Sequence, residues 1–330
     1  MDTELIDKCL DLYCKSGLTR KNYKVDLLKI KKYIEEKNIS LDELKHEDIK
    51  LFFNEYEKKY ATESVNRCKN AISFLYRYLV KNDYLDSKSE KVISDLERKI
   101  PNNKQEKYLN KNEIKMFLEF LKNAPRQRNE QVKTFLFSRS RDLFLFELLI
   151  HRGIRSTETS LLKLSYINIE QKRIFIPKEI RKNGNNKYGL DLSIILDDNL
   201  IDLYKKYIIE REKISTDNDY VFVKPNGNPL FIHDKKNNTY TAGGTLTSIL
   251  RKRIKNFNMY NMIVKPSFKP IDETLSIHCL RHTAVYYLRT EHGLNNYQMA
   301  RMLGQKSIES QRKYEHIRDE DIEEKLNSNI

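Results

Sequence analysis

Four separated stretches of the chain hold residue types that could act together on a phosphate group. They are HRGIRSTETSLLKL (151–164), KEIRKNGNNK (178–187), SIHCLRHTAVYYLRTEHG (276–293) and MARMLGQKSIESQRKYEHI (299–317). The last stretch contains Tyr314, one of 20 tyrosines, with Arg312 and Lys313 directly before it. A free tyrosine has a pKa of about 10, so it becomes a nucleophile only where cations favour its phenolate form.

The first and third stretches place basic residues at helix positions. Gly153 is expected to end one helix and Ser156 to begin the next, so Arg155 would stand at a helix N-terminus, where an anion is favoured. Taken alone, such an arginine is usually a surface residue. His278 and Arg281 lie three residues apart and would share one face of a helix. A histidine at the edge of a core would explain His278, but it gives no reason for the arginine beside it.

The second stretch is a cationic turn, and turns of this kind usually face solvent without a chemical role. In the fourth stretch, Gly304 is expected to stop a helix, and Tyr314 would lie two turns into the helix that follows. The basic residues of the turn are Lys178, Arg181, Lys182 and Lys187.

Together these residues are the parts for phosphoryl transfer without a metal or another cofactor. Two arginines can clamp the non-bridging oxygens of a phosphodiester, a histidine can donate or relay a proton, and a lysine can protonate the departing alkoxide. The sequence has no phosphate-binding glycine loop, and its carboxylates are not clustered as in a two-metal nuclease. The pattern therefore predicts strand cleavage that keeps the bond energy in a covalent phosphotyrosine.

The segment that precedes these stretches is expected to be helical. Only Gly17 among the nine glycines lies in the first 150 residues, and the first proline is Pro101. Apolar residues recur at helical spacing in three segments. A polar stretch around Pro101 then predicts a linker over 99–107. The three predicted helices cover 18–39, 42–60 and 62–82.

The rest of the chain mixes strand and helix patterns. Residues 166–177 alternate like a β-hairpin, and 188–195 could add a third strand. Helical patterns return over 195–214, 245–257 and 276–330.

Composition limits the class of protein. The 330 residues carry a net charge of +14, which favours a polyanionic partner, although a solvated lysine-rich surface would give the same number. No apolar run approaches the ~20 residues of a membrane span, and the acidic start does not resemble a signal peptide. The four cysteines show no metal-ligand spacing, so we expect reduced thiols, no structural metal and a cytoplasmic location.

In this order, the stretches resemble the tyrosine recombinases, the phage-integrase superfamily that includes the Xer and Cre recombinases. RGIRSTETSLLKL is similar to the G-x-R-x-x-E box, which implies that Arg155 is the first catalytic arginine and Glu158 its supporting acid. IHCLRHTAVYYL is similar to the H-x-L-R-H-T box. That match implies catalytic roles for His278 and Arg281, with His282 as their usual neighbour.

LGQKSIESQRKYEHI resembles the L-G-H box, which implies that Tyr314, nine residues after Gln305, is the nucleophile. Gln305 departs from the usual histidine; its amide can donate to a phosphate oxygen but cannot titrate. The K-x-G-K turn of the family favours Lys182 as the general acid. Because the loop is longer here, Lys187 remains the alternative.

The resemblance covers about residues 15–317 and implies a mainly α (α+β) fold. It implies a C-shaped clamp on duplex DNA, in which a helical, SAM-like core-binding domain precedes a mixed catalytic domain with a small antiparallel three-stranded sheet. The expected domains are 1–98 and 108–330, joined by the linker 99–107. The expected assembly is a dimer on one recombination site and a tetramer in synapsis, without a membrane partner.

The implied function is site-specific recombination, of an integrase, transposase or resolvase type. Three alternatives share the fold: a type IB topoisomerase-like enzyme, a telomere resolvase and a catalytically silent DNA-binding regulator. The acidic tail at 318–330 would either dock on a neighbouring subunit or fray.

Overall fold

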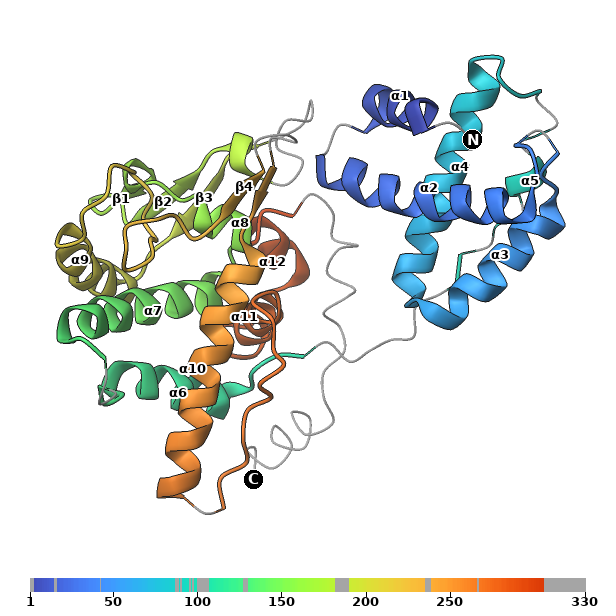
Figure 1. Cartoon of the computed structure of the whole chain (residues 1–330). Coiled ribbons are helices and arrows are strands. Elements are labelled where there is room, and N and C mark those ends of the chain that lie inside the picture. The colour runs from blue at the N-terminus through green and yellow to red at the C-terminus, as the bar shows by residue number, and fades with distance from the viewer. Residues whose placement is uncertain are drawn as a thin grey trace. The chain divides into compact units, whose positions relative to one another are not determined.

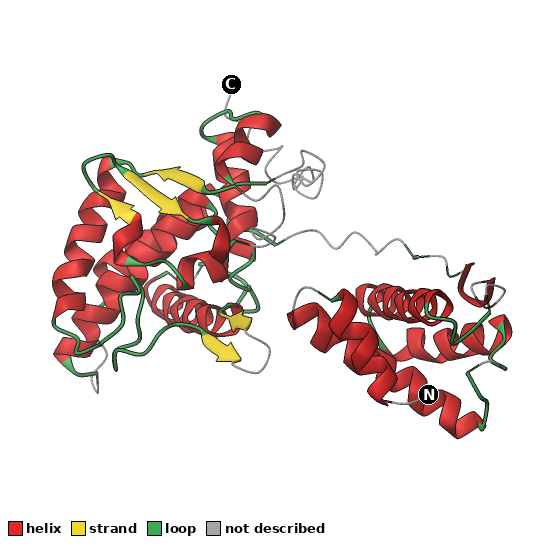
Figure 2. Cartoon of the chain, turned by 90° about the horizontal axis from the view of Figure 1, so that it is seen from above, coloured by secondary structure: helices red, strands yellow, loops and turns green. Residues whose placement is uncertain are grey.

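The structure is a computed structural model that describes residues 3–14, 17–41, 43–86, 89, 91–94, 96, 98–99, 107–126, 130–181, 190–234, 239–265 and 267–305. Helices predominate and the strands are short (Figures 1 and 2). The predicted mainly α class with a small antiparallel sheet is confirmed. The chain divides into two compact units: the first comprises Met1–Lys104 and Asp234–Thr239, and the second comprises Gln105–His233 and Tyr240–Ile330.

The first unit is a helical bundle with its own apolar core. Aromatic side chains form much of this core, with Phe52 packed edge-on against both Tyr33 and Phe53. One carboxylate lies within it: buried Asp26 accepts a hydrogen bond from Arg67 Nε (2.7 Å). The pairing offsets the cost of burying the charge. The helices are α1 (Thr3–Tyr13), α2 (Gly17–Lys37), α3 (His46–Lys59), α4 (Thr62–Lys81) and α5 (Lys91–Ser94).

The predicted helices 18–39 and 62–82 correspond closely to α2 and α4, but the helix predicted from residue 42 begins at His46. The Asp48 carboxylate explains the later start, because it accepts from the Lys45 backbone N–H (3.0 Å) at the first turn of α3. Ahead of it, Ser40 Oγ donates to Glu43 Oε2 (2.6 Å) and holds a turn.

The second unit is built around α7, against which α6, α9 and α11 pack (Figure 1). The apolar run 143–150 lies in α7 and is almost wholly buried. This makes α7 the scaffold for the segments that follow it. The helices are α6 (Lys111–Asn123), α7 (Val132–Arg152), α8 (Ser156–Ser160), α9 (Asp198–Glu212), α10 (Gly243–Val264), α11 (Cys279–Thr290) and α12 (Asn296–Met302), with short 3-10 turns η2 (Leu164–Tyr166) and η3 (Lys178–Ile180).

A three-stranded antiparallel sheet covers part of this core, as predicted. Its order is β1 (Ile167–Asn168), β2 (Arg173–Ile176), β3 (Leu192–Ile195). In register, Ile174 faces Ile194 across β2 and β3, and both are buried, whereas Phe175 is exposed. One face therefore packs on the core and the other meets solvent. A second pair, β4 (Ile232–Asp234) and β5 (Thr239–Thr241), was not predicted, because three-residue strands carry too little periodicity.

Two of the later helix predictions need correction. The helix predicted over 245–257 is α10, which extends from Gly243 to Val264. The helical region predicted over 276–330 is broken after Thr290: Gly293 adopts a left-handed φ of 62°, and α12 follows. Residues beyond 305 lie outside those described. No helix in the described ranges is long and apolar enough to cross a membrane.

The residues at the two ends of the predicted linker each have partners in one unit. Lys99 pairs with Glu57 (Nζ to Oε2, 2.5 Å), and its carbonyl accepts from Asn66 Nδ2 (2.8 Å). Lys107 pairs with Asp272 (Nζ to Oδ2, 2.5 Å) in the second unit. The predicted boundaries at residues 98 and 108 stay a prediction.

Candidate active site

The described residues of the predicted site come from three places in the second unit. Arg155 and Glu158 lie at the junction of α7 and α8. His278, Arg281 and His282 lie at the start of α11, and Gln305 follows α12. The remaining predicted residues, Lys182, Lys187 and Tyr314, lie outside the described residues.

Gly153 allows these three segments to pack closely against one another. As predicted, it ends α7, with φ of 61° and its N–H donated to the Leu149 carbonyl (2.9 Å). A Cβ at this position would lie 2.6 Å from Leu303 Cδ2 and 3.0 Å from Ala284 Cβ. The backbone before Arg155 therefore packs directly on α11 and on the turn after α12.

Gly153→Ala is expected to destabilise the fold more than Gly293→Ala. Both glycines have left-handed φ, which costs an alanine roughly 1–2 kcal/mol. Only Gly153 would also add overpacking, at about 1–3 kcal/mol, because a Cβ at Gly293 meets nothing within 4 Å. Urea unfolding of the two variants measures the difference. Equal losses of unfolding free energy in the two variants would show that Leu303 and Ala284 move aside at little cost.

Arg281 ties the three places to one another. Its side chain is buried, with 4% of the residue exposed. Nη1 donates to the Gly153 carbonyl (2.5 Å), and Nη2 donates to the Leu303 carbonyl (3.0 Å). These two bonds fix the plane of the guanidinium between the α7–α8 turn and the turn after α12.

The start of α11 is held by α10. Thr247 Oγ1 accepts from the Ile277 backbone N–H (3.0 Å), and Arg251 Nε donates to the Leu275 carbonyl (3.1 Å). His278 follows as the N-cap of α11 with helical backbone angles, so it lies on the same side as Arg281, as predicted. The ring of His282 meets that of His278 edge-on, at 5.0 Å between centroids.

Glu158 is the carboxylate of the site, and only 1% of it is exposed. It accepts from the Arg155 backbone N–H at Oε2 (3.2 Å) and from Arg155 Nη1 at Oε1 (2.9 Å). The Arg155 side chain remains 27% exposed. A buried acid thus orients an arginine that solvent can still reach. The supporting role of Glu158 stays a prediction.

Gln305 follows a Schellman motif that ends α12. Gly304 has φ of 60° and donates its N–H to the Arg301 carbonyl (3.2 Å), and the Gln305 N–H reaches back to the Ala300 carbonyl (2.8 Å). The prediction that Gly304 stops a helix is confirmed. The motif fixes the backbone at the residue that stands where the family usually has histidine.

Arg181 is the residue that sequence reasoning missed. The sequence pattern predicts a solvent-facing cationic turn at this position, but the Arg181 side chain is only 10% exposed. Nη2 donates to the Gly304 carbonyl (2.5 Å), and Nε lies 3.7 Å from Glu158 Oε1. No local pattern could have revealed this, because the Gly304 partner is 123 residues away.

Positive charge is concentrated at this site. The guanidiniums of Arg155 and Arg181 both approach the single carboxylate of Glu158, and Arg281 and Arg181 bond the consecutive carbonyls of Leu303 and Gly304. An arrangement with three cationic groups and one buried anion favours a bound phosphate.

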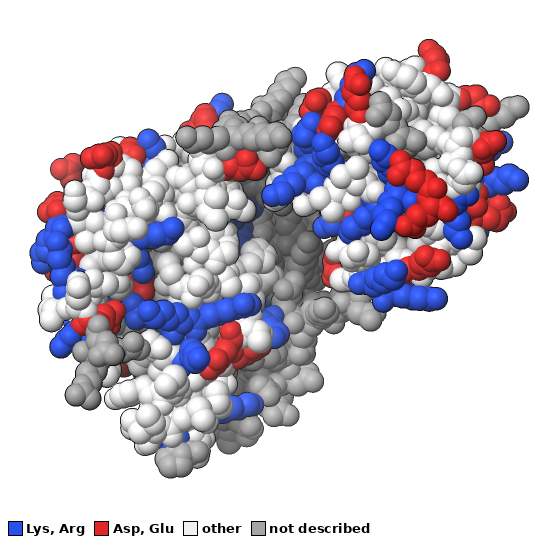
Figure 3. Space-filling view, in the orientation of Figure 1, with Lys and Arg blue, Asp and Glu red and all other residues white. Residues whose placement is uncertain are grey.

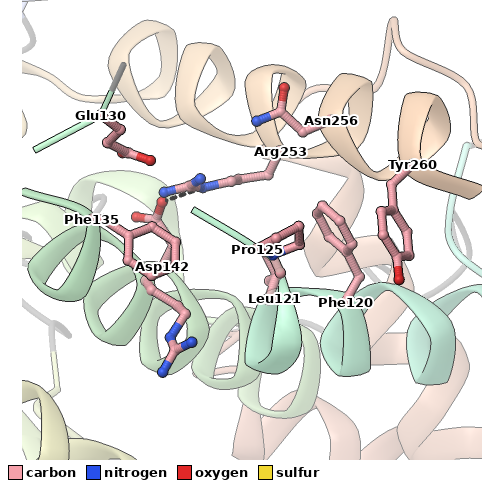
Figure 4. A pocket seen from close by; sticks show the side chains of 11 residues that line it. Phe120, Leu121, Pro125, Glu130, Phe135, Asp142, Arg253, Asn256 and Tyr260 are labelled. Atoms are coloured by element: carbon pink, nitrogen blue, oxygen red, sulfur yellow. Dashed lines mark hydrogen bonds and ion pairs between the residues drawn. The ribbon is translucent and has the colours of Figure 1, made fainter. Parts of the chain in front are cut away.

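A separate cavity of about 110 Å³ contains none of the predicted site residues (Figure 4). Phe120 and Tyr260 line it together with Arg253, whose Nε donates to buried Asp142 Oδ2 (2.7 Å). Asp142 also pairs with Arg141 (2.7 Å). This ion cluster joins α7 to α10 and is structural.

Comparison with known families covers most of the chain. The Phage integrase family matches residues 107–321, and the phage integrase N-terminal SAM-like domain matches residues 5–86. Tyrosine recombinase XerC of Oceanobacillus iheyensis is 24% identical over 313 residues, which are 94% of this chain and 88% of that protein.

Solved recombinase structures share the fold. XerH in a post-cleavage complex with a palindromic difH substrate aligns with a TM-score of 0.68 at 21% identity, over 98% of this chain and 88% of that one. The Tn1549 transposon integrase in complex with circular intermediate DNA gives a TM-score of 0.66 at 16% identity, over 98% of both chains. A lambda integrase dimer bound to a core site gives 0.64 at 15% identity, over 94% and 93%. With its family match over more than half its length, this chain belongs to the phage integrase family of tyrosine recombinases, a class of enzymes that break and rejoin DNA strands.

Proposed function

We propose that this protein is a site-specific DNA recombinase that cleaves and rejoins strands through a covalent 3′-phosphotyrosine, without metal or ATP. The Tyr314 phenol loses its proton, to His278 or to water, and its oxygen forms a bond to the scissile phosphorus while the bond from phosphorus to the 5′ oxygen breaks. A lysine ammonium, Lys182 or Lys187, gives its proton to the departing 5′ oxygen. A 5′-hydroxyl from a partner strand then reverses these steps and completes strand exchange.

The observation that carries this proposal is the way the two arginines are held. Arg281 is fixed in its plane by the Gly153 and Leu303 carbonyls, and Arg155 is oriented by buried Glu158. The Gly153 carbonyl lies two residues before Arg155, so one hydrogen bond links the segments that carry both guanidiniums. Such preorganisation suits the binding of a phosphate whose charge grows in the transition state. His278 and Gln305 complete the proposed phosphate ligands, with His282 in support.

Charge and relatives support DNA as the substrate. The net charge is +14, and lysine and arginine side chains are spread over both units on the face that Figure 3 shows. The XerH, Tn1549 and lambda structures hold recombinases bound to DNA. We therefore assign residues 1–98 and 108–330 to DNA binding and catalysis, joined by the linker 99–107. The proposed assembly is a dimer on one site and a tetramer in synapsis.

Covalent trapping tests the proposal. A duplex that the purified protein selects from a random-sequence pool is rebuilt with a nick beside the scissile phosphate, so that the short cleaved strand diffuses away. We expect a protein–DNA adduct to accumulate, and peptide mapping to place the linkage on Tyr314. An adduct on another residue, or sequence-selective binding without any adduct, would contradict the proposal; the latter would point to a regulator.

The same selected site separates recombination from its enzymatic alternatives. A plasmid with two copies should exchange strands between them, giving deletion or inversion products. Relaxation of a single-site supercoiled plasmid without exchange between two sites would indicate a topoisomerase-like activity.

A further inference from the structure

We propose that Arg181 is a positioning residue that anchors the loop 182–189 to the active site, and so places the general acid that the loop carries. The inference rests on the proposed function, because it concerns the protonation step of strand cleavage. Both candidate general acids, Lys182 and Lys187, belong to this loop. The proposal therefore does not depend on which of them acts.

The guanidinium of Arg181 closes the base of this loop. Arg181 directly precedes the loop, and its Nη1 donates to the carbonyl of Leu190, which directly follows it. A second tie spans the same base, from the Lys178 backbone N–H to Asp191 Oδ1 (2.9 Å). Both ends of the loop are thus fixed to one another by described contacts.

The same guanidinium attaches this base to the rest of the site. Nη2 donates to the Gly304 carbonyl, one residue before Gln305, and Nε lies 3.7 Å from Glu158, the partner of Arg155. Gly304 has a left-handed φ of 60°, and a Cβ there would force the Arg181 guanidinium to move, because it would overlap Nη2 and lie 3.0 Å from Cζ. One side chain therefore links residues 181 and 190, on either side of the loop, to the segments of two proposed phosphate ligands.

The partners of Arg181 indicate a positioning role. One of its terminal nitrogens donates to the Leu190 carbonyl, at the end of the loop itself, and the other to the Gly304 carbonyl, so the side chain joins two backbone segments. A general acid must come within about 3 Å of the proton acceptor, and an error of about 1 Å can cost roughly 100-fold in rate. Loss of the anchor is thus expected to impair proton donation above all.

A sulfur atom at the bridging 5′ position isolates this step. Tyr314 attacks in the same way, but the bond that breaks joins phosphorus to sulfur. A thiol has a pKa of about 8.5, against about 15.7 for water, so the thiolate departs without taking a proton. Cleavage of the sulfur substrate thus needs no general acid.

The experiment compares single-turnover cleavage of the oxygen and sulfur versions of one nicked duplex. We expect Arg181→Ala to cleave the oxygen substrate about 100-fold more slowly than wild type, and the sulfur substrate within about threefold of wild type. The matched control is Arg173→Ala, which removes the same charge from the start of β2, at a partly exposed position where Nη1 donates to Ser193 Oγ (3.0 Å). It should leave both rates near wild type. Lys182→Ala and Lys187→Ala show which lysine is the general acid: the variant that lacks it should cleave the oxygen substrate slowly and the sulfur substrate near the wild-type rate.

Two further variants keep the test decisive if Arg181→Ala folds poorly. Arg181→Lys keeps the charge beside Glu158 but cannot bond both carbonyls in the same geometry, so a smaller defect with the same rescue is expected. Gly304→Ala displaces the Arg181 guanidinium by adding a methyl group at its partner residue. Gly293→Ala is the control, because it also places an alanine at left-handed backbone angles but meets no neighbouring side chain.

Equal slowing on the two substrates, or normal cleavage of the oxygen substrate by these variants, would overturn the inference. Wild-type protein that forms no adduct with either substrate would overturn the proposed function and this inference together. Wild-type adducts with a null result for Arg181 would overturn the inference alone.

Discussion

Replacing Tyr314 with phenylalanine is expected to abolish covalent cleavage, with a rate loss of about 10⁴-fold or more, while sequence-selective DNA binding is retained. Phenylalanine keeps the ring but has no oxygen to attack phosphorus. Adduct formation on the nicked duplex measures the first effect, and a mobility-shift titration at fixed salt measures the second.

The control for this variant is Tyr297→Phe. Tyr297 lies in α12 and is 72% exposed, so its hydroxyl is solvated and its loss should change neither measurement. Residual adduct in Tyr314→Phe, mapped to another tyrosine, would contradict the assignment. Buried tyrosines are poor substitutes, because burial raises the pKa of Tyr56, Tyr76 and Tyr207, which keeps their phenols protonated.

Arg281→Ala is expected to lower the cleavage rate by about 10³-fold and also to destabilise the protein. The rate falls because a fixed, charged donor to the scissile phosphate is lost. Stability falls by about 1–3 kcal/mol, because the Gly153 and Leu303 carbonyls lose their bonds to the guanidinium. Single-turnover cleavage and urea unfolding measure the two effects. Arg281→Lys should recover part of the stability but little of the rate, since an ammonium cannot reproduce the planar fork.

Arg211→Ala separates the two effects. Arg211 is also buried, and within the described residues its hydrogen bonds go to backbone carbonyls, with Nε and Nη2 reaching the Tyr220 carbonyl at 2.9 and 2.6 Å. Its replacement should cost comparable stability but, below the unfolding transition, leave cleavage within a few-fold of wild type. A rate loss as large as that of Arg281→Ala would mean that stability alone explains both variants.

Short local patterns predict much of the site. The box around Arg155 and Glu158 is a helix stop followed by a helix start, and the box around His278 and Arg281 is a single helix face. Both depend on residues within a few positions of each other, so their local structure follows from the sequence. The helices of the first unit and the three-stranded sheet were predictable for the same reason, because period 3.6 and period 2 are local signals.

The sequence did not predict which backbone atoms, distant along the chain, would accept hydrogen bonds from these side chains. Arg181 looks like any cation at a hairpin turn until the Gly304 carbonyl, brought close by tertiary packing, accepts its hydrogen bond. Gly153 likewise carries only the signal of a helix stop. Its second constraint, the approach of Leu303 and Ala284, exists only in the folded chain. Local chemistry was therefore easier to predict than the contacts that align it.

The two lysines at the ends of the predicted linker, Lys99 and Lys107, limit how far apart the two units can work. From Lys99 to Lys107 there are eight peptide steps, which span at most about 29 Å whatever path the chain takes. That length is less than one turn of B-form DNA, about 34 Å. If both units bind a duplex, as proposed, binding by one raises the effective concentration of the other to the millimolar range. The protein would then behave as a bivalent ligand, and avidity would conceal much of the loss in affinity when a substitution weakens DNA binding by only one unit.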